Sequence, residues 1–522
     1  MSGKLYPVGI QNFESLRKDG YFYVDKTELM YRLVKTGRYY FLSRPRRFGK
    51  SLLISTLEAY FQGKKELFEG LAVYGLEKEW LEYPILHLDL NTQKYETPEA
   101  LENVLDESLA YWETLYGRNE NEIGQARRFA GVIRRAKEKT GRRVVILVDE
   151  YDKPMLQAIG NDELQDRYRS TLKAFYGALK SEDGNIKFAL LTGVTKFGKV
   201  SVFSDLNNLM DISRDERYTD ICGISEKELL DNFSEDIAEL ARANGQTYEQ
   251  ACAQLKEDYD GYHFCPDSIG IYNPFSLLNT FKSRRYGSYW FETGTPTYLV
   301  ELLKKNRCDL KETFGIEADD GMLDNIFIDD NPVPVLYQSG YLTIVGHGSL
   351  PGTYRLGFPD LEVERNFVRY IFPFYANVDR VRSASEIKKF VLEIGSGDID
   401  GFMERLRSFL AGCPYELARD IELHYQNVLF IVFRLAGLYT EVEYRTSRGR
   451  IDLALKTRDY IYVMEFKLDG SAEDAIKQIE DRQYALPFSK DSRKVYTIGV
   501  NFSSQTRNID RWIVVSACHY ME

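Results

Sequence analysis

The spacing of apolar and polar residues sets apart the first 215 residues, in which predicted strands and helices alternate. Short apolar runs predict strands at residues 39–42, 84–90, 144–148 and 188–194. Stretches with helical spacing predict the helices between them, at residues 50–60, 99–116 and 120–140. The run at 144–148 is apolar without interruption, which is typical of a central parallel strand buried on both faces. This alternation predicts an α/β fold with a parallel sheet and helices on both faces.

The pattern changes after residue 215. Helical stretches there mix with short strand-like pieces at 341–345 and 353–358, and Gly-Pro-rich turns interrupt them, which predicts a mostly helical domain with small hairpins. Residues 383–411 have helical spacing and predict a connector. The last hundred residues predict an α/β domain built of a helix, several strands, a helix at 472–484 and strands at 495–502 and 512–517. The predicted domains are therefore 1–215, 216–375, 376–420 and 421–522.

Composition limits the class of protein and its partners. A net charge of −11 argues against a protein that coats nucleic acid, although residues 422–522 are neutral and hold three close arginines, Arg445, Arg448 and Arg450. Those arginines would meet phosphate or form a solvated face. The six cysteines include no Cys-x-x-Cys pair, and no apolar run approaches the ~18 residues of a membrane span. These features predict a cytoplasmic protein without a membrane partner, in which carboxylates would hold any metal.

A phosphate-binding loop is predicted between the first strand and the helix that follows it. Residues 44–51 read RPRRFGKS, which keeps the functional half of the pattern G-x-x-x-x-G-K-[ST], with Arg44 in place of the first glycine. Gly49 would let the backbone approach phosphates, Lys50 would bridge the β- and γ-phosphates, and Ser51 would ligate Mg²⁺. Phe48 belongs to the same loop and is included in the predicted nucleotide site.

An acidic pair at the end of the strand at 144–148 would complete this site. Asp149 would hold Mg²⁺ and Glu150 would orient the attacking water, at the sheet edge where open α/β sheets bind ligands. Thr192, near the end of the strand at 188–194, would sense the γ-phosphate or serve a structural role. The pair would otherwise be an ordinary solvated loop start.

The motifs of this part resemble the bacterial AAA-ATPase-like family, whose members often carry a C-terminal PD-(D/E)xK nuclease domain. The similar runs are YPVGIQNF at 6–13, YVDKT at 23–27, RPRRFGKS at 44–51 and DEYDKP at 149–154. The resemblance covers nearly the whole chain and implies an ATP-binding P-loop domain. Lys50, Ser51, Asp149 and Glu150 match its Walker residues. It also implies a winged-helix-like segment, matched at 259–262 and 272–276, and makes Arg44 a usual variant.

Several arginines have two interpretations. Arg46 and Arg47 lie within the loop, so we expect them to contact the nucleotide or nucleic acid rather than acids elsewhere. Arg214 and Arg217 are candidates for a trans-acting arginine finger, which would require a homo-oligomer.

A second candidate site lies near the C-terminus. Strands predicted at 450–456 and 460–468 are joined by a short turn, and the period of two puts Glu465 and Lys467 on one face, near Asp452. Two carboxylates suit Mg²⁺ or Mn²⁺, and Lys467 would position the attacking water and stabilise the transition state. The same residues in a surface salt bridge are the simpler alternative.

Two further residues follow from the similarity of this region to the nuclease superfamily. Gln478 on the helix at 472–484 would support the lysine or the phosphate. Glu422 on the upstream helix would be a further metal ligand, with Glu443 as its competitor.

Together these patterns predict an ATP-binding protein whose Mg²⁺-dependent domain cuts DNA. One alternative is a nucleotide switch whose nuclease-like domain only docks nucleic acid or a partner protein. Another is a nuclease that acts on RNA, because nothing in the sequence selects DNA.

Overall fold

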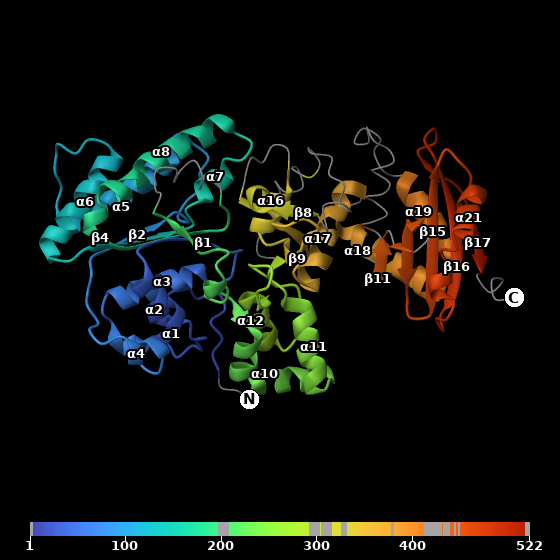
Figure 1. Cartoon of the computed structure of the whole chain (residues 1–522), viewed down its shortest axis with the longest axis horizontal. Coiled ribbons are helices and arrows are strands. Elements are labelled where there is room, and N and C mark those ends of the chain that lie inside the picture. The colour runs from blue at the N-terminus through green and yellow to red at the C-terminus, as the bar shows by residue number, and fades with distance from the viewer. Residues whose placement is uncertain are drawn as a thin grey trace. The chain divides into compact units, whose positions relative to one another are not determined.

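A computed structural model of the chain describes residues 4–196, 208–291, 303, 316–324, 331–376, 380–411, 431, 439–442, 445–446, 449–450 and 452–516 (Figure 1). The chain forms two compact units. The first comprises Met1–Asn306 and Phe314–Val363, and the second comprises Arg307–Thr313 and Glu364–Glu522. No helix among the described residues is both long and apolar enough to cross a membrane.

A parallel five-stranded sheet forms the centre of the first unit. Its order is β2-β3-β4-β1-β5, with strands Tyr39–Ser43 (β1), Ile85–Asp89 (β2), Val144–Asp149 (β3), Ile186–Gly193 (β4) and Met210–Asp211 (β5). Strand β4 lies between β1 and β3, so the loop after β1 and the acidic end of β3 share the carboxyl edge of the sheet. Ligands bind at this edge in open α/β sheets.

Helices cover both faces of this sheet (Figure 1). One group is Phe13–Lys18 (α1), Thr27–Thr36 (α2), Lys50–Phe61 (α3) and Ala72–Leu76 (α4). The other group is Pro98–Tyr116 (α5), Gln125–Thr140 (α6), Lys153–Gln157 (α7) and Asp162–Ser181 (α8). Helix α6 begins later than its sequence pattern predicts, because Gly117 and Gly124 adopt positive φ angles of 95° and 84° in the turn before it.

The rest of the first unit is mostly helical. Its helices are Glu226–Asn244 (α10), Tyr248–Tyr259 (α11), Pro274–Ser283 (α12), Asp320–Asp324 (α15), Val333–Gln338 (α16) and the start of Leu361–Ala376 (α17). Two small antiparallel sheets accompany them, formed by Ile224–Ser225 (β6), Ile271–Tyr272 (β7), Glu317–Asp319 (β8), Thr343–His347 (β9) and Thr353–Gly357 (β10). Single 3₁₀ turns occur at Lys65–Phe68, Asp183–Asn185 and Glu216–Tyr218.

The second unit is built around a five-stranded sheet of order β11-β14-β15-β16-β17. Its strands are Tyr439–Val442 (β11), Leu453–Lys456 (β14), Tyr460–Leu468 (β15), Lys494–Ser503 (β16) and Asn508–Ser516 (β17). The β15–β16 pair is parallel and the other pairs are antiparallel. A separate hairpin pairs Arg445–Thr446 (β12) with Gly449–Arg450 (β13), and a 3₁₀ turn spans Leu486–Phe488.

Helices pack on both faces of the second sheet. Ala472–Asp481 (α21) crosses β16 so closely at Gly499 that a Cβ there would lie 2.3 Å from the Ala472 carbonyl oxygen. Tyr496 points to the opposite face, because side chains alternate along a strand, and it stacks with Tyr462, whose hydroxyl donates to the Ile394 carbonyl at 2.7 Å.

The predicted connector is therefore part of this packing. Arg380–Ser396 (α18) and Ile399–Ala411 (α19) belong to the second unit, and Gly397, with φ 84°, separates them. The α/β class, the parallel sheet, the mostly helical middle part and the C-terminal α/β sheet domain are confirmed.

Candidate functional site

The loop between β1 and α3 forms the floor of a pocket of about 820 Å³. Gly49 ends the loop in the left-handed conformation (φ 95°, ψ 19°), and no side chain caps α3. The uncapped N–H groups at the helix start favour an anion. Lys50 is buried, and its Nζ donates to the carbonyls of Arg44 and Pro45 at 3.1 and 3.2 Å. Ser51 also lines the pocket.

Arg44 takes no part in lining the pocket. Its guanidinium is buried, lies 3.8 Å over the Phe264 ring and donates to the Ser213 and Tyr218 carbonyls at 2.7 and 3.1 Å. Burial lowers the pKa of this guanidinium. The residue that replaces the first glycine of the phosphate loop therefore ties the loop to the segment after β5.

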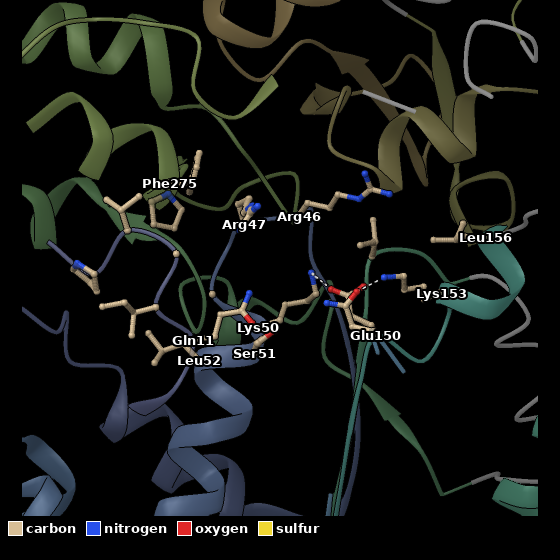
Figure 2. Close-up of a pocket in the computed structure, with 18 of the residues that line it drawn as sticks. Gln11, Arg46, Arg47, Lys50, Ser51, Leu52, Glu150, Lys153, Leu156 and Phe275 are labelled. Atoms are coloured by element: carbon tan, nitrogen blue, oxygen red, sulfur yellow. Dashed lines mark hydrogen bonds and ion pairs between the residues drawn. The ribbon is translucent and has the colours of Figure 1, made fainter. Parts of the chain in front are cut away.

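The three residues before Gly49 point in different directions. Arg46 and Arg47 line the pocket, and the Arg47 guanidinium lies 5.0 Å over the ring of Phe275 (Figure 2). The Phe48 ring is buried instead, in edge-on contact with Tyr262 at 4.7 Å. Only the backbone of Phe48 is left for a phosphate, because its ring belongs to the core.

The acidic pair lies at the end of β3, as its sequence position predicts. Asp149 is buried and its Oδ1 accepts hydrogen bonds from the Thr192 hydroxyl at 2.6 Å and from the Glu150 N–H at 3.1 Å. Glu150 adopts a positive φ of 53°, lines the pocket and forms an ion pair with Lys50 at 3.7 Å. Thr192 thus contacts Asp149 rather than the pocket.

Asp152 is a buried acid to which the sequence interpretation gave no role. It accepts hydrogen bonds from the N–H groups of Val194 and Thr195 and from the Thr195 hydroxyl, at 3.2, 2.6 and 2.7 Å. Burial, with the charge of Glu150 as a smaller cause, raises its pKa to about 6. Its place in the DEYDKP motif was the available signal.

The pocket walls contain residues that the sequence interpretation did not assign. One wall is the N-terminal segment 7–11 and another is the start of α12, with Phe275 and Leu278. Five cationic side chains line the pocket against two carboxylates: Arg46, Arg47, Lys50, Lys94 and Lys153 against Glu96 and Glu150. This surplus of positive charge suits a polyphosphate.

The two arginine-finger candidates have acidic partners within the chain. Arg214 forms ion pairs with Asp320 and Asp324, both at 3.0 Å, and Arg217 pairs with Asp215 at 2.6 Å.

The second unit brings four predicted residues together at one end of its sheet. Asp452 precedes β14, and its Oδ2 accepts the Phe466 N–H at 2.9 Å, which holds it beside Glu465 on β15. The Lys467 Nζ donates to Glu465 Oε1 at 3.3 Å and to Gln478 Oε1 at 2.6 Å. Gln478 on α21 also donates to Glu465 Oε1.

Glu465 is the electrostatic centre of this group. It is 2% exposed, and its second oxygen, Oε2, has no hydrogen-bond partner among the described residues. Burial, and secondarily the charge of Asp452, raises its pKa to about 7. The described residues contain no group of three or more His, Cys, Asp or Glu side chains arranged to hold a metal. Glu422 and Glu443 lie outside the described residues.

Comparisons with known proteins match both the N-terminal and the C-terminal part of the chain. A family model described as "Predicted AAA-ATPase" matches residues 7–203, and one described as "PD-(D/E)XK nuclease superfamily" matches residues 420–512. An Azotobacter chroococcum mcd 1 protein, named "Uncharacterized protein in vnfD 5'region", is 35% identical over 532 residues, which cover 99% of this chain and 100% of that protein. The resemblance found in the sequence is confirmed: the chain belongs to the family of AAA-ATPase-like proteins that carry a C-terminal domain of the PD-(D/E)XK nuclease superfamily.

Proposed function

We propose that this protein binds and hydrolyses ATP, and that its nucleotide state controls a Mg²⁺-dependent domain that cuts DNA. The observation that carries the proposal is the grouping of Asp452, Glu465, Lys467 and Gln478 at one end of the C-terminal sheet. A surface salt bridge would not require the buried carboxylate that this group contains.

A divalent metal ion suits this group. Asp452 and Glu465 would hold it, because a buried carboxylate oxygen without a protein partner costs free energy that a cation would recover. When bound, the metal would lower the pKa of a water molecule and neutralise charge on the scissile phosphate.

The neighbouring residues have distinct tasks. Lys467 would place its positive charge beside the phosphate and the attacking water. Gln478 holds both Lys467 and Glu465, so it fixes the direction in which the lysine points.

The pocket of the first unit supports ATP as its ligand. Its loop supplies helix N–H groups and Lys50 for the phosphates, and Ser51, which lines the pocket, would ligate the accompanying Mg²⁺. Asp149, buried at the end of β3, would hold the same ion. Glu150 would orient the water that attacks the γ-phosphate. The apolar wall at Val8, Phe275 and Leu278 is suited to the base.

A chain of contacts supports control by the nucleotide. The Trp290 indole N–H donates to the carbonyl of Arg46 in the phosphate loop at 2.9 Å, and the Trp290 backbone N–H donates to Glu362 at 2.7 Å. Glu362 is the second residue of α17, whose later residues belong to the second unit. If the phosphate loop moves when ATP binds, the hydrogen bonds of Trp290 would transmit that movement to the start of α17.

The test is cleavage of plasmid, single-stranded DNA and RNA by the full-length chain, with Mg²⁺ or Mn²⁺ and with or without ATP. Wild type is compared with Lys50→Ala and Asp452→Ala. Metal-dependent DNA cleavage that Asp452→Ala abolishes, and that ATP changes only when Lys50 is present, supports the proposal. Cleavage that ATP never alters contradicts the control by nucleotide. A folded, ATP-binding chain that cuts nothing supports the nucleotide switch with a docking domain instead.

A further inference from the structure

In the turn after β3, successive residues face either the pocket or the protein interior. Glu150, at φ 53°, turns its carboxylate into the pocket, and its carbonyl accepts the Lys153 N–H at 3.0 Å. The next two residues, Tyr151 and Asp152, are buried. Lys153 returns to the pocket. Pocket-facing and buried positions therefore follow one another within a single tight turn.

The two buried residues connect this turn to the end of β4 by hydrogen bonds. The Tyr151 hydroxyl donates to the Thr195 carbonyl at 3.0 Å, and Asp152 accepts the N–H and hydroxyl of the same threonine. Gly193 allows the approach, because a Cβ there would lie 2.5 Å from the Asp152 carboxylate and 2.6 Å from the Tyr151 ring. These hydrogen bonds of Tyr151 and Asp152 consequently hold the residues on either side of them, Glu150 and Lys153, in position.

The side chain of Lys153 reaches across the carboxyl edge of the sheet. It donates to the side-chain oxygen of Asn91, which follows β2, and Asn91 in turn donates its N–H to Asp89 at 2.8 Å. In Figure 2, the labelled side chains of Lys50, Glu150 and Lys153 all lie in this pocket, and dashed lines mark the Lys50–Glu150 ion pair and the hydrogen bond from Lys153 to Asn91. Glu150 thus forms its ion pair with Lys50, while Lys153 is held by Asn91 and lines the same pocket.

We propose that Lys153 supplies, from within the same chain, the cation that contacts the γ-phosphate of ATP and stabilises its transfer to water. The inference rests on the proposed nucleotide function. It does not need an arginine from a neighbouring copy, and Arg214 and Arg217, which the sequence offers only as weak candidates for that role, form ion pairs within the chain.

The chemistry assigns a task to each residue. The water oxygen forms a bond to the γ-phosphorus while the bond from that phosphorus to the β–γ bridging oxygen breaks and leaves ADP. The water proton passes to Glu150 or to the departing phosphate. Lys50 and Lys153 flank the γ-phosphoryl group and neutralise the charge that spreads over its oxygens.

Binding of ADP and of a non-hydrolysable ATP analogue tests the γ-phosphate contact directly. Wild type should prefer the analogue, and Lys153→Ala should reduce that preference by about tenfold or more, as expected for one charge-assisted hydrogen bond. ADP affinity should stay within about threefold, because Lys153 is not assigned to the α- or β-phosphate. Lys153→Arg, which keeps the charge, should restore most of the preference.

Turnover tests whether the cation acts in cis. Lys153→Ala should lower kcat on the order of 100-fold with little change in KM. Adding an excess of Lys50→Ala protein, which cannot support ATP turnover itself but retains its own Lys153, should not restore activity. The matched control is Lys227→Ala, which removes an exposed lysine of α10 that does not line the pocket.

Each other outcome has a definite meaning. An unchanged analogue-to-ADP preference in Lys153→Ala overturns the inference, and so does restoration of turnover by the Lys50→Ala protein. Failure of folded wild-type protein to bind either nucleotide overturns the proposed nucleotide function as well, so the two failures are distinguishable.

Discussion

The two candidate sites of this chain carry opposite charge: the nucleotide site has an excess of positive side chains, and the C-terminal site has two carboxylates close together. At the nucleotide site, the buried acid Asp149 accepts hydrogen bonds from two donors, and the side chains that line the pocket include more cations than carboxylates. In the C-terminal site, Glu465 keeps one buried oxygen without a partner and has another carboxylate, Asp452, beside it. The first site is suited to an anion and the second to a cation.

This difference shows in how each site holds its charged side chains. The Lys50 ammonium in the pocket is held by the carbonyls of Arg44 and Pro45 and by Glu150. Burial, and secondarily the charge of Asp452, instead raise the pKa of Glu465 to about 7. The comparison teaches that the site suited to an anion holds its lysine with carbonyls and one carboxylate, whereas the site suited to a cation brings two carboxylates close together.

The strongest test of this contrast exchanges one acid in each site for its amide. Glu465→Gln should lower DNA cleavage on the order of 1000-fold or more, because a metal ligand is lost. It should also leave the free energy of unfolding unchanged or raise it by about 1 kcal/mol at pH 8, since the buried charge is removed. Cleavage rates and urea unfolding at that pH measure the two effects.

Asp149→Asn is the partner experiment. It should lower stability by about 1 to 2 kcal/mol, because the hydroxyl of Thr192 and the N–H of Glu150 lose a charged acceptor. Equal stability changes for the two amides would contradict the contrast.

Arg44→Gly creates the first glycine that a consensus phosphate loop would have. A sequence argument predicts better ATP binding from it. The structure predicts a loss of at least about 3 kcal/mol in the free energy of unfolding, because a buried guanidinium donates to several carbonyls and covers Phe264. Thermal unfolding and ATP titration separate the two expectations. Arg44→Lys should also destabilise the protein, because an ammonium cannot reproduce the planar set of donors.

The sequence predicted the backbone of both sites well and their side-chain partners less well. Apolar runs located the strands, so the acidic end of β3 and the pairing of Glu465 with Lys467 followed from period and order. The position of Phe48 did not follow, because a loop residue shows no period and its ring packs against Tyr262, more than two hundred residues later.

Asp152 and the N-terminal pocket wall were missed for a related reason. An acid is expected at the surface, and although Asp152 lies in the DEYDKP motif, its hydrogen bonds with Val194 and Thr195 were needed to show that it is buried and holds the turn to the end of β4. The segment at residues 7–11 belongs to the YPVGIQNF run, but its place against the pocket depends on tertiary packing that the run alone does not indicate.

Gly193→Ala tests how rigid the preformed site must be. The added methyl group would collide with Asp152 and Tyr151, so we expect a loss of about 1 to 3 kcal/mol in stability and a clear loss of ATP turnover. Gly177→Ala on α8 is the matched control, because a Cβ there meets nothing within 4 Å and alanine favours the helix by about 0.5 to 1 kcal/mol. If the two variants behave alike in unfolding and turnover assays, the connection of this turn to β4 does not control the site.

The smallest effect should come from Gln478→Ala. Gln478 does not supply charge; it joins Lys467 to Glu465, so its removal should lower cleavage by about tenfold and raise the Mg²⁺ concentration needed for half-maximal rate. Asp481→Ala, an exposed acid at the end of the same helix, should change neither quantity. A drop in rate with an unchanged Mg²⁺ requirement would mean that Gln478 steers only the lysine. A shift in the Mg²⁺ requirement would show that even a neutral amide helps the C-terminal site to keep its two carboxylates ready for a cation.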